Sequence, residues 1–552
     1  MKIKTHQILF IIIFIFSLFL RLYKLDQFPP SLNWDEISHT YNAYSLAKTG
    51  KDQWGVSWPI FNFRAYGDFP TTLNMYLTLP LVKYFGINAF TSRLPSALLG
   101  ALTLIPTYFL AKLILKKEKL ALFVTLLSAV SPWSLFPSRA VFQSTISSFF
   151  LIGGITLLLY TLKQQKKTLL IYSSVFLALS QYAYHNTRIV IPLLVPIILF
   201  IYKKQTSALF KKHKNTVLIS MAIFLIFTIP QLINLSLPDS QARSRWTFIL
   251  NQDAINIINH QRGQSTLSPF FARLVHNKLT YFIPKFITNY INFLNPYLLF
   301  FKGTGNYQFN IPNTGILYSI CLPFFYIGIL SLNKLSPNNK KLILLWFIIG
   351  LLPSALTSGD FPIIRAVSIL PIPYILIALG LEFMPKLLPI ISLGLFLQFF
   401  SYWNKYINFY PQKYSQSWQY GYKQAIDFIK ENYSEYDQIY FTKKYGEAHE
   451  FVLFYWPWDP ETYQSDPNKV WDYHANWYWV DAFDKFKFIN DWEIVPRHPE
   501  LVEGSSRTST LLITSPNNYP QTNANHPQGD AKLLKTINFL DNTPAFEIIA
   551  YE

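Results

Sequence analysis

The sequence predicts a polytopic α-helical membrane protein with about eleven transmembrane helices and a small C-terminal extracytoplasmic α/β domain. Of its 552 residues, 51% are hydrophobic and only 14% are charged, whereas about a quarter of the residues in soluble globular proteins are charged. Apolar runs of spanning length also recur along most of the chain. They lie near residues 7–22, 94–115, 119–136, 141–162, 168–184, 188–202, 216–235, 315–332, 341–357, 364–384 and 386–402.

The lysines predict which ends of these helices face the cytoplasm. They gather between apolar runs, as at Lys116-Lys117 and Lys166-Lys167, which is the positive-inside pattern. The formal charge of +18 therefore reflects membrane topology, and we expect no nucleic-acid partner. With the N-terminus inside, the long loops 23–93 and 236–314 and the tail face outward. We expect a multi-pass protein of the plasma membrane with its site on the extracytoplasmic side.

Two further segments near the N-terminus decide this topology. The first apolar run is followed directly by Arg21 with no small-residue cleavage site, which predicts a retained helix. Residues 71–86 are also apolar, but if they crossed the membrane every later lysine-rich loop would change sides. We therefore expect this segment to form an amphipathic or re-entrant helix at the outer interface.

The chain divides into a transmembrane domain, residues 1–405, and an extracytoplasmic domain, residues 410–552. After about residue 410 the sequence becomes charged and aromatic. A helical stretch (QAIDFIKENY) precedes strand-like ones (DQIYFTKK and FEIIAYE), which predicts an α/β fold. Residues 496–528 are rich in Pro, Asn, Ser and Thr and predict loops or an insertion.

Two adjacent carboxylates follow the first apolar run, in Asn33-Trp34-Asp35-Glu36. A carboxylate near the bilayer surface suits a catalytic base for a lipid-borne substrate, and Trp34 suits packing against a sugar ring. An aromatic neighbour also lowers the local dielectric, which raises the pKa of a carboxyl group. The alternative is that the pair caps the helix starting at Ile37.

The next outer carboxylate is Asp68, in Tyr66-Gly67-Asp68-Phe69-Pro70. It suits a second substrate ligand, but Gly-Asp followed by Pro is also ordinary turn chemistry. Arg139 lies at the outer end of a helix pair, where the positive-inside bias makes arginine unexpected. Phosphate binding explains its position better than snorkelling does.

Two more outer turns carry cations. The turn QYAYHNTRI contains Tyr182, His185 and Arg188, and Arg365 follows Thr357-Ser358-Gly359-Asp360. Each has an alternative explanation as an interfacial aromatic belt or a lipid headgroup contact. Several cations on one face, however, suit a polyprenyl phosphate. No second His or Cys stands at ligand spacing from His185, so we expect no closed zinc site there.

Five segments together carry a resemblance to a known class. They are RLYKLDQFPPSLNWDEISHTYNAYSLAKTGKD, Arg93-Leu94-Pro95-Ser96-Ala97, SPWSLFPSRAVF, YAYHNTRI and LPSALTSGDFPIIRA. In these segments the chain resembles the polyprenyl-phosphate-dependent glycosyltransferases of the GT-C class, which includes protein O-mannosyltransferases and the aminoarabinose transferase of lipid A. The resemblance covers nearly the whole chain and implies an inverting transfer from a lipid-phosphate sugar on the outer membrane face, with Asp35 as the base. Divalent-metal involvement varies within the class, so the resemblance commits to no cofactor.

The sequence departs from this class at two places. Gln143 occupies a position that is usually acidic, and a neutral amide is a poorer ligand than a carboxylate for a hard divalent metal. The class usually has a Lys and two prolines after the position of Asp68, whereas this chain has Phe69-Pro70-Thr71-Thr72. Phosphate binding is then left to Arg64, Arg139 or Arg365.

The sequence thus predicts a membrane glycosyltransferase that takes a sugar from a polyprenyl-phosphate donor. Asp35 is the predicted general base, Glu36 positions the acceptor or Asp35, and Asp68 orients the substrate. Arg139, His185 and Arg188 are predicted to hold the lipid phosphate, with the tail domain guiding the acceptor. A lipid-linked glycan transporter or flippase, and a catalytically impaired binding homologue, are the alternatives. The sequence leaves open which sugar is moved and whether the acceptor is a protein, a glycolipid or a glycan.

Overall fold

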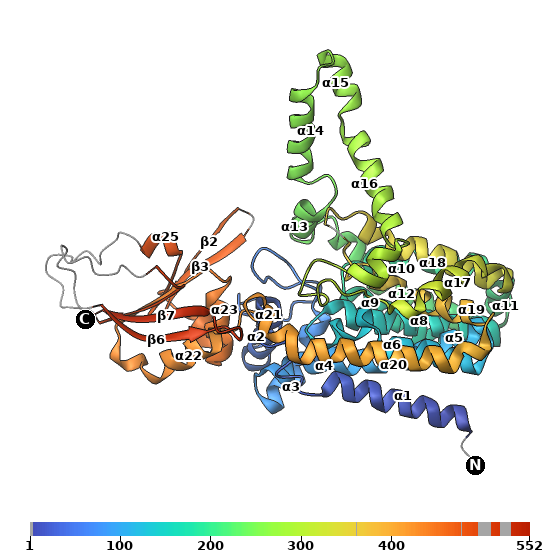
Figure 1. Ribbon diagram of the computed structural model, residues 1–552, viewed down its shortest axis with the longest axis horizontal. Coiled ribbons are helices and arrows are strands. Elements are labelled where there is room, and N and C mark those ends of the chain that lie inside the picture. Colours follow the sequence, from blue (N-terminus) through green and yellow to red (C-terminus); the bar gives the residue numbers. More distant parts are fainter. Residues whose placement is uncertain (1–3, 360, 476, 495–508, 519–530, 552) are drawn as a thin grey trace. The chain divides into compact units, whose positions relative to one another are not determined.

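A computed structural model describes residues 4–359, 361–475, 477–494, 509–518 and 531–551 (Figure 1). The chain forms two compact units. The first comprises Met1–Tyr23, Phe69–Leu73 and Pro95–Trp403, and the second comprises Lys24–Asp68, Asn74–Leu94 and Asn404–Glu552. The sequence prediction attached the first outer loop to the transmembrane domain, whereas most of that loop belongs to the compact unit that contains the tail.

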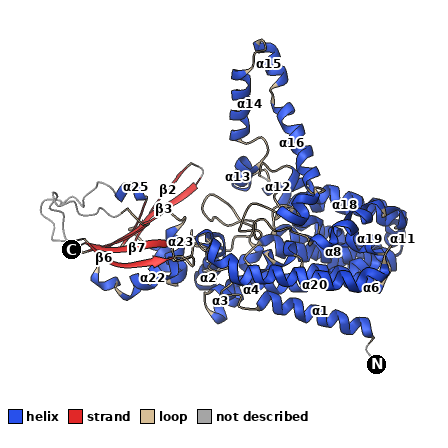
Figure 2. Ribbon diagram, in the orientation of Figure 1, coloured by secondary structure: helices blue, strands red, loops and turns tan. Residues whose placement is uncertain are grey.

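The named secondary-structure elements of the first unit, within the described residues, are all helices (Figure 2). Its longer helices are α1 (Thr5–Leu22), α4 (Ala89–Leu102), α5 (Leu104–Leu115), α6 (Glu118–Val130), α8 (Gln143–Gln164), α9 (Thr168–Ala183), α10 (Thr187–Ile201), α11 (Lys203–Lys212), α12 (Lys214–Asn234), α18 (Pro337–Ala355), α19 (Ile372–Leu381) and α20 (Leu388–Asn404). Shorter or outlying helices are α7 (Pro132–Leu135), α13 (Pro238–Thr247), α14 (Gln252–Gln264), α15 (Pro269–Val275), α16 (Lys278–Asn292) and α17 (Leu322–Leu330).

Five helical segments among the described residues are long and apolar enough to cross a membrane, and up to seven if each of two bent pairs counts as one span. This agrees with a polytopic helical membrane protein, but the predicted count of about eleven is not confirmed. One reason is helix length. At about 1.5 Å per residue, α17 and α19 are too short to cross roughly 30 Å of hydrocarbon, although the sequence around each is apolar. A second reason is breakage, because α6 and the Pro132–Arg139 segment that follows it meet at 59°.

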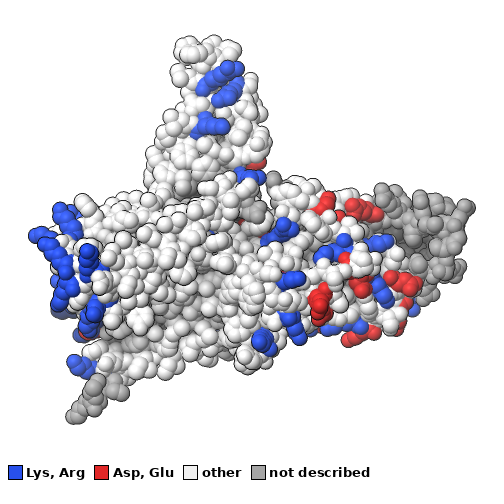
Figure 3. Space-filling model, turned by 180° about the vertical axis from the view of Figure 1, so that it is seen from behind, with Lys and Arg blue, Asp and Glu red and all other residues white. Residues whose placement is uncertain are grey.

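Lysine and arginine side chains gather at one end of the helical unit (Figure 3). The sequence explains this placement, since α5, α8 and α10 all end beside lysine-rich connections. The lysines that the positive-inside rule assigned to the cytoplasm therefore lie together.

The second unit contains a seven-stranded mixed sheet with the strand order β2-β3-β4-β1-β5-β7-β6. Its strands are β1 (Gln438–Thr442), β2 (Val470–His474), β3 (Trp477–Phe483), β4 (Phe486–Ile489), β5 (Thr510–Thr514), β6 (Lys532–Asn538) and β7 (Pro544–Tyr551). Strand β1 runs parallel to β4 and β5, and the other pairs are antiparallel. The helices are α2 (Trp34–Thr49), α3 (Leu73–Phe85), α21 (Tyr410–Tyr414), α22 (Tyr422–Glu431), α23 (Ala448–Tyr455), α24 (Pro460–Ser465) and α25 (Asp491–Ile494). The predicted α/β character of the tail is confirmed.

The core of this unit joins the tail to the first loop. Tyr422 of α22 stacks on Phe451 of α23, with ring centroids 3.9 Å apart, and both side chains are fully buried. Ile37 and Tyr41 of α2 are buried in the same cluster, and α2 packs against α23. Because burial of a large apolar side chain contributes roughly 1.5–3 kcal/mol, these contacts fix α2 on the sheet domain.

Two segments singled out in the sequence remain. The segment 71–86 contains helix α3, whose 13 residues span only about 20 Å and so fall short of the hydrocarbon thickness. Its expected place at the outer interface stays a prediction. Most of the predicted loop at 496–528 lies outside the described residues, and its apolar Leu511-Leu512-Ile513 belongs to β5.

Candidate active site

Helix α2 begins at Trp34, three residues earlier than the sequence predicted, because Asn33 caps it. The Asn33 side chain accepts a hydrogen bond from the Glu36 backbone N–H at 2.9 Å, and the Glu36 carboxylate accepts one from the Asn33 backbone N–H at 3.1 Å. This reciprocal pair is a capping box, which satisfies donors that an isolated helix start leaves unpaired. At the other end, Gly50 adopts the left-handed conformation (φ +70°) that ends the helix. The cap is thus made by Asn33 with Glu36, whereas the capping alternative assigned it to the pair Asp35 and Glu36.

Glu36 also forms a buried ion pair with Arg93. Arg93 Nε lies 2.9 Å from Glu36 Oε1 and Nη2 lies 3.0 Å from Oε2, while the two side chains are 0% and 1% exposed. The same guanidinium donates to the carbonyl oxygens of Leu25 and Pro29 at 3.0 and 2.9 Å. Arg93 therefore connects the segment before α2 to the first turn of that helix. The Glu36 carboxylate points toward the Arg93 guanidinium.

Asp35, by contrast, is exposed at the first turn of α2. Tyr66 donates a hydrogen bond from its hydroxyl to Asp35 Oδ1. Burial, helped by the adjacent Asp35, raises the pKa of Tyr66 well above its ordinary value, so the phenol keeps its proton and acts as a donor. The structure thus presents one carboxylate to solvent and fixes its orientation through a buried phenol.

Aromatic rings pack around the Tyr66 side chain that bonds this carboxylate. Tyr66 stacks on Trp477 of β3, with ring centroids 4.9 Å apart, and the Trp34 ring meets Tyr66 edge-on at 6.2 Å. Trp477 Nε1 donates to Glu447 Oε1. Burial raises the pKa of Glu447 to about 7. Asp35, Tyr66, Trp477 and Glu447 therefore form a connected row from the first loop into the sheet domain.

Two glycines make room for these rings. A Cβ on Gly67 would overlap the Trp477 ring, and a Cβ on Gly446 would overlap the Trp34 ring. Gly446 also has a φ of +113°, which other residues rarely adopt. Sequence reasoning missed Tyr66, Trp477 and Glu447 as site residues. The available signal was a Tyr-Gly-acid triplet that occurs in the first loop at Tyr66 and again in the tail at Tyr445.

The remaining first-loop candidates lie nearby in sequence but in different surroundings. Asp68 is buried, and its main-chain oxygen accepts from the Ala65 N–H at 3.1 Å. The Arg64 guanidinium lies over the rings of Tyr478 and Trp54, at 4.3 and 5.2 Å from their centroids. Arg64 is thus held among aromatic rings by cation–π contacts.

In the first unit, Arg139 is fully buried and donates to main-chain oxygens at the end of α1, those of Leu20 and Tyr23, the latter at 2.7 Å. Its guanidinium also lies 5.4 Å from the centroid of the Trp403 ring. These contacts explain an arginine at this end of the helices without a phosphate, because they fix where α1 ends.

Gln143 starts α8 and donates from Nε2 to the carbonyl and hydroxyl oxygens of Thr71, at 2.9 and 2.7 Å. Thr71 in turn donates to the carbonyl of Ala183 at 2.8 Å. The amide that replaces the usual acid therefore links three chain segments of the first unit.

The two cation-bearing turns of the first unit are neighbours. His185 Nδ1 and Arg188 Nη1 lie 3.1 Å apart, and Asn186 donates to the carbonyl oxygen of Arg365 at 2.6 Å. The Arg365 side chain donates to Thr357 Oγ1 at 2.6 Å. The structure thus places His185, Arg188 and Arg365 on adjacent turns of the first unit.

Tyr182, also placed in the first of these turns, donates from its hydroxyl to the carbonyl oxygen of Phe227 in α12 at 3.3 Å. Its ring meets the Phe227 ring edge-on at 5.9 Å. These contacts hold it against a neighbouring apolar helix.

Within the ranges that the structure describes, no group of three or more His, Cys, Asp or Glu side chains is arranged to hold a metal ion.

No protein-family model and no curated protein matches the chain. Among solved structures it is similar to the oligosaccharyltransferase AglB from Archaeoglobus fulgidus in complex with an inhibitory peptide and a dolichol-phosphate, with 13% identity over 81% of this chain and a TM-score of 0.48. That match covers 63% of the AglB chain, so the present chain spans less than two thirds of its length. It is also similar to ArnT from Cupriavidus metallidurans bound to undecaprenyl phosphate, with 10% identity, 98% and 97% of the two chains covered and a TM-score of 0.43.

A further AglB structure with a comparable match is a complex with Zn and sulfate, at 13% identity over 81% of this chain and 61% of that chain, with a TM-score of 0.47.

Proposed function

We propose that the chain is an integral membrane glycosyltransferase that moves a sugar from a polyprenyl-phosphate donor to an extracytoplasmic acceptor hydroxyl. The observation that carries this proposal is the exposed Asp35 carboxylate, which Tyr66 orients and whose immediate neighbour Glu36 is locked in a buried ion pair. An exposed carboxylate on a rigid helix start is suited to general-base catalysis, because its position is fixed while its reactive oxygen remains accessible.

In the proposed reaction, Asp35 removes the proton from the acceptor hydroxyl as its oxygen attacks the anomeric carbon of the sugar. The bond from that carbon to the phosphate oxygen breaks, and the polyprenyl phosphate leaves with the electron pair. Attack opposite the leaving group inverts the anomeric configuration. The hydrogen bond from the Tyr66 hydroxyl to Oδ1 fixes the orientation of the Asp35 carboxylate for this proton transfer.

In this proposal Glu36 positions Asp35 and does not take part in the chemistry. Its carboxylate is committed to Arg93 and to the cap of α2, so it holds the helix turn that carries Asp35. The alternative in which Glu36 itself contacts the acceptor has no support from these contacts. Trp34 lies beside the base and offers an aromatic surface to a sugar ring.

Donor phosphate binding is assigned to His185, Arg188 and Arg365, which share adjacent turns. Guanidinium groups bind phosphate oxygens through charge-assisted hydrogen bonds. Arg139 is better explained by its contacts with the end of α1, and Arg64 by its aromatic cage. Asp68 keeps the predicted part of orienting substrate next to Tyr66.

Sugar transfer in membranes supplied with a radiolabelled polyprenyl-phosphate sugar tests this proposal. We expect Asp35→Asn to reduce transfer by about 100-fold or more, as loss of a general base does, while the wild-type chain transfers label. Asp26→Asn is the matched control, because Asp26 is an exposed aspartate of the same loop.

Equal transfer by Asp35→Asn and the wild-type chain would contradict the assignment of the base. Movement of the labelled lipid between leaflets without any transfer would favour a flippase instead.

A further inference from the structure

Helices α14, α15 and α16, residues 252–292, form a helical arm on the first unit (Figure 1). Helices α14 and α16 lie side by side, joined by α15 at the tip, and Arg262 of α14 donates to the carbonyl oxygen of His276 at 2.6 Å. The arm runs across the direction of α1, α8 and α20 rather than along it (Figure 2). Since those helices include the segments able to cross a membrane, an element that crosses their direction runs along the bilayer plane.

The base of the arm is fixed to the end of an apolar helix. Asn289 donates to the carbonyl oxygens of Ala355 and Thr357 at 2.9 and 2.8 Å, where α18 ends, and Tyr290 donates to that of Ile348 at 2.9 Å. The lysine-rich end of the unit lies at the opposite end of the helices (Figure 3). The arm therefore leaves the unit at the boundary that the positive-inside rule assigns to the outer membrane face.

One face of α16 is apolar and exposed. Leu279, Ile283, Ile287 and Ile291 recur every four residues and are between 45% and 64% exposed. Residues at this spacing share one side of a helix. At the tip, Phe270 and Phe271 of α15 are 72% and 54% exposed. Exposed apolar side chains are therefore present both at the tip and along one face of α16.

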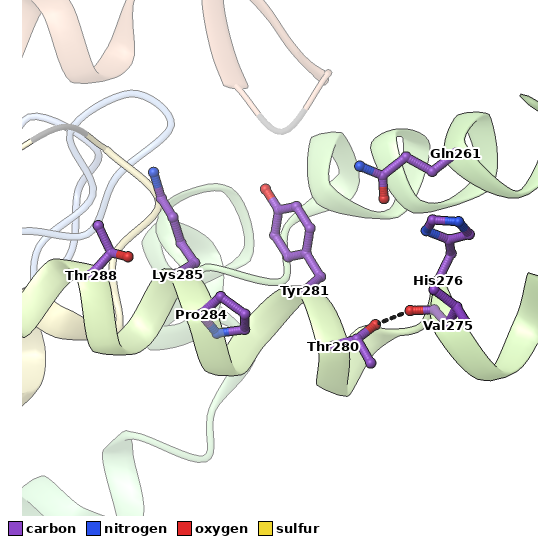
Figure 4. Close-up of a pocket in the computed structure, with 8 residues that line it drawn as sticks. All are labelled: Gln261, Val275, His276, Thr280, Tyr281, Pro284, Lys285 and Thr288. Atoms are coloured by element: carbon purple, nitrogen blue, oxygen red, sulfur yellow. Dashed lines mark hydrogen bonds between the residues drawn. The ribbon is translucent and has the colours of Figure 1, made fainter.

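The other face of the arm is polar. Between α14 and α16 lies a cavity of about 390 Å³, lined by Gln261, Val275, His276, Thr280, Tyr281, Pro284, Lys285 and Thr288 (Figure 4). Gln261, Tyr281 and Lys285 extend into the space between the two helices (Figure 4). The arm is thus amphipathic, with polar side chains on one side and exposed aliphatic ones on the other.

The charge of the arm matches an anionic lipid surface. Residues 252–292 contain four basic residues, Arg262, Arg273, Lys278 and Lys285, against the single acidic Asp253. Positive charge is unusual at an outer boundary, so it calls for an anionic partner there. An amphipathic helix with a basic polar face and aromatic or aliphatic residues on the other is the pattern of helices that lie in the membrane interface.

We propose that α15 and the apolar face of α16 lie in the headgroup region of the outer leaflet, bound to anionic lipid, with the polar cavity facing water. The bilayer rather than another protein is the partner that the arm's direction, its attachment at the end of α18 and its charge together favour. This inference stands independently of the proposed reaction.

Site-directed fluorescence on the full chain in nanodiscs tests this placement. Cys321 is the sole cysteine and is buried, so Cys321→Ala gives a cysteine-free background. A bimane label is introduced through Phe271→Cys or Ile283→Cys on the apolar side, and through Gln261→Cys on the cavity side as the control. We expect nitroxide lipids to quench the first two labels about threefold more than the third, with aqueous iodide showing the reverse order. Equal quenching at all three positions would overturn the proposal.

A pair of charge substitutions sharpens the test. In the Phe271→Cys chain, Ile283→Glu is expected to reduce quenching by nitroxide lipid, because it places a carboxylate on the buried face, whereas Thr288→Glu on the cavity side leaves it unchanged. Quenching at position 271 should also be stronger with anionic than with zwitterionic lipid. If quenching appears only in discs that hold two copies of the chain, a second copy covers the face and the proposal is wrong.

Discussion

Replacing Glu36 with glutamine isolates the buried ion pair beneath the proposed base. The substitution keeps the side-chain oxygen that caps α2 but leaves the Arg93 guanidinium, which is 0% exposed, with only neutral carbonyl partners. Removing one partner of a buried pair typically costs about 3–5 kcal/mol, because the remaining charge is not compensated. We therefore expect Glu36→Gln to destabilise the second unit by this amount and to reduce transfer through misplacement of Asp35.

Urea unfolding of the purified chain, followed by tryptophan fluorescence, measures this effect. Two control variants separate the loss of the ion pair from the loss of the helix cap and from a change at Asp35. Asn33→Ala removes a capping side chain and is expected to cost only about 1 kcal/mol. Asp35→Asn alters an exposed group and is expected to change stability by no more than about 0.5 kcal/mol. If Glu36→Gln unfolds like the wild-type chain yet loses transfer, Glu36 acts in the chemistry and the positioning argument is refuted.

Four further predictions follow from the same contacts. Tyr66→Phe removes the hydrogen-bond donor to Asp35. Because a carboxylate that loses a hydrogen bond is less easily ionised, the acid limb of the pH–transfer profile should move to higher pH. An acid limb that does not move would argue against the contact. Gly67→Ala should lower both transfer and stability because its Cβ meets the Trp477 ring, and the added change Trp477→Leu should restore stability. Burial raises the pKa of Glu450 from 4.5 to about 8, so the folded chain keeps a proton that the unfolded chain releases between these pH values. The free energy of unfolding should therefore fall as the pH rises from 4.5 to about 8, by at most about 5 kcal/mol. The Glu450→Gln variant should show a smaller fall. Arg365→Gln should raise the KM for the lipid-linked donor about tenfold, measured by titration of donor, with kcat nearly unchanged.

Local patterns in the sequence predicted much of the fold. Apolar runs and lysine clusters predicted a helical membrane protein whose cationic side chains gather at one end, because hydrophobic length and loop charge are properties of short segments. The helical and strand-like stretches of the tail predicted its α/β character for the same reason. The count of spans was less accessible, since the bend after α6 and the shortness of α17 depend on how neighbouring helices pack.

The site was predictable only in part. Motifs singled out Asp35, Glu36 and the two cationic turns as candidates, but they did not indicate that Glu36 is buried in an ion pair while Asp35 is exposed. Arg93 is 57 residues from Glu36, and Trp477 is still further from Tyr66, so no local pattern reports these contacts. The sequence also could not report that Arg139 donates hydrogen bonds to main-chain oxygens at the end of α1, because those partners are more than 100 residues away in the chain.

The central claim is that Asp35 works on the extracytoplasmic face, and accessibility labelling of intact cells tests it most directly. In the Cys321→Ala background, Asp26→Cys places a thiol in the same loop without altering the base. A membrane-impermeant maleimide should label this thiol on intact cells as fully as after permeabilisation. Labelling that appears only after the cells are permeabilised would put Asp35 on the cytoplasmic side and contradict the account.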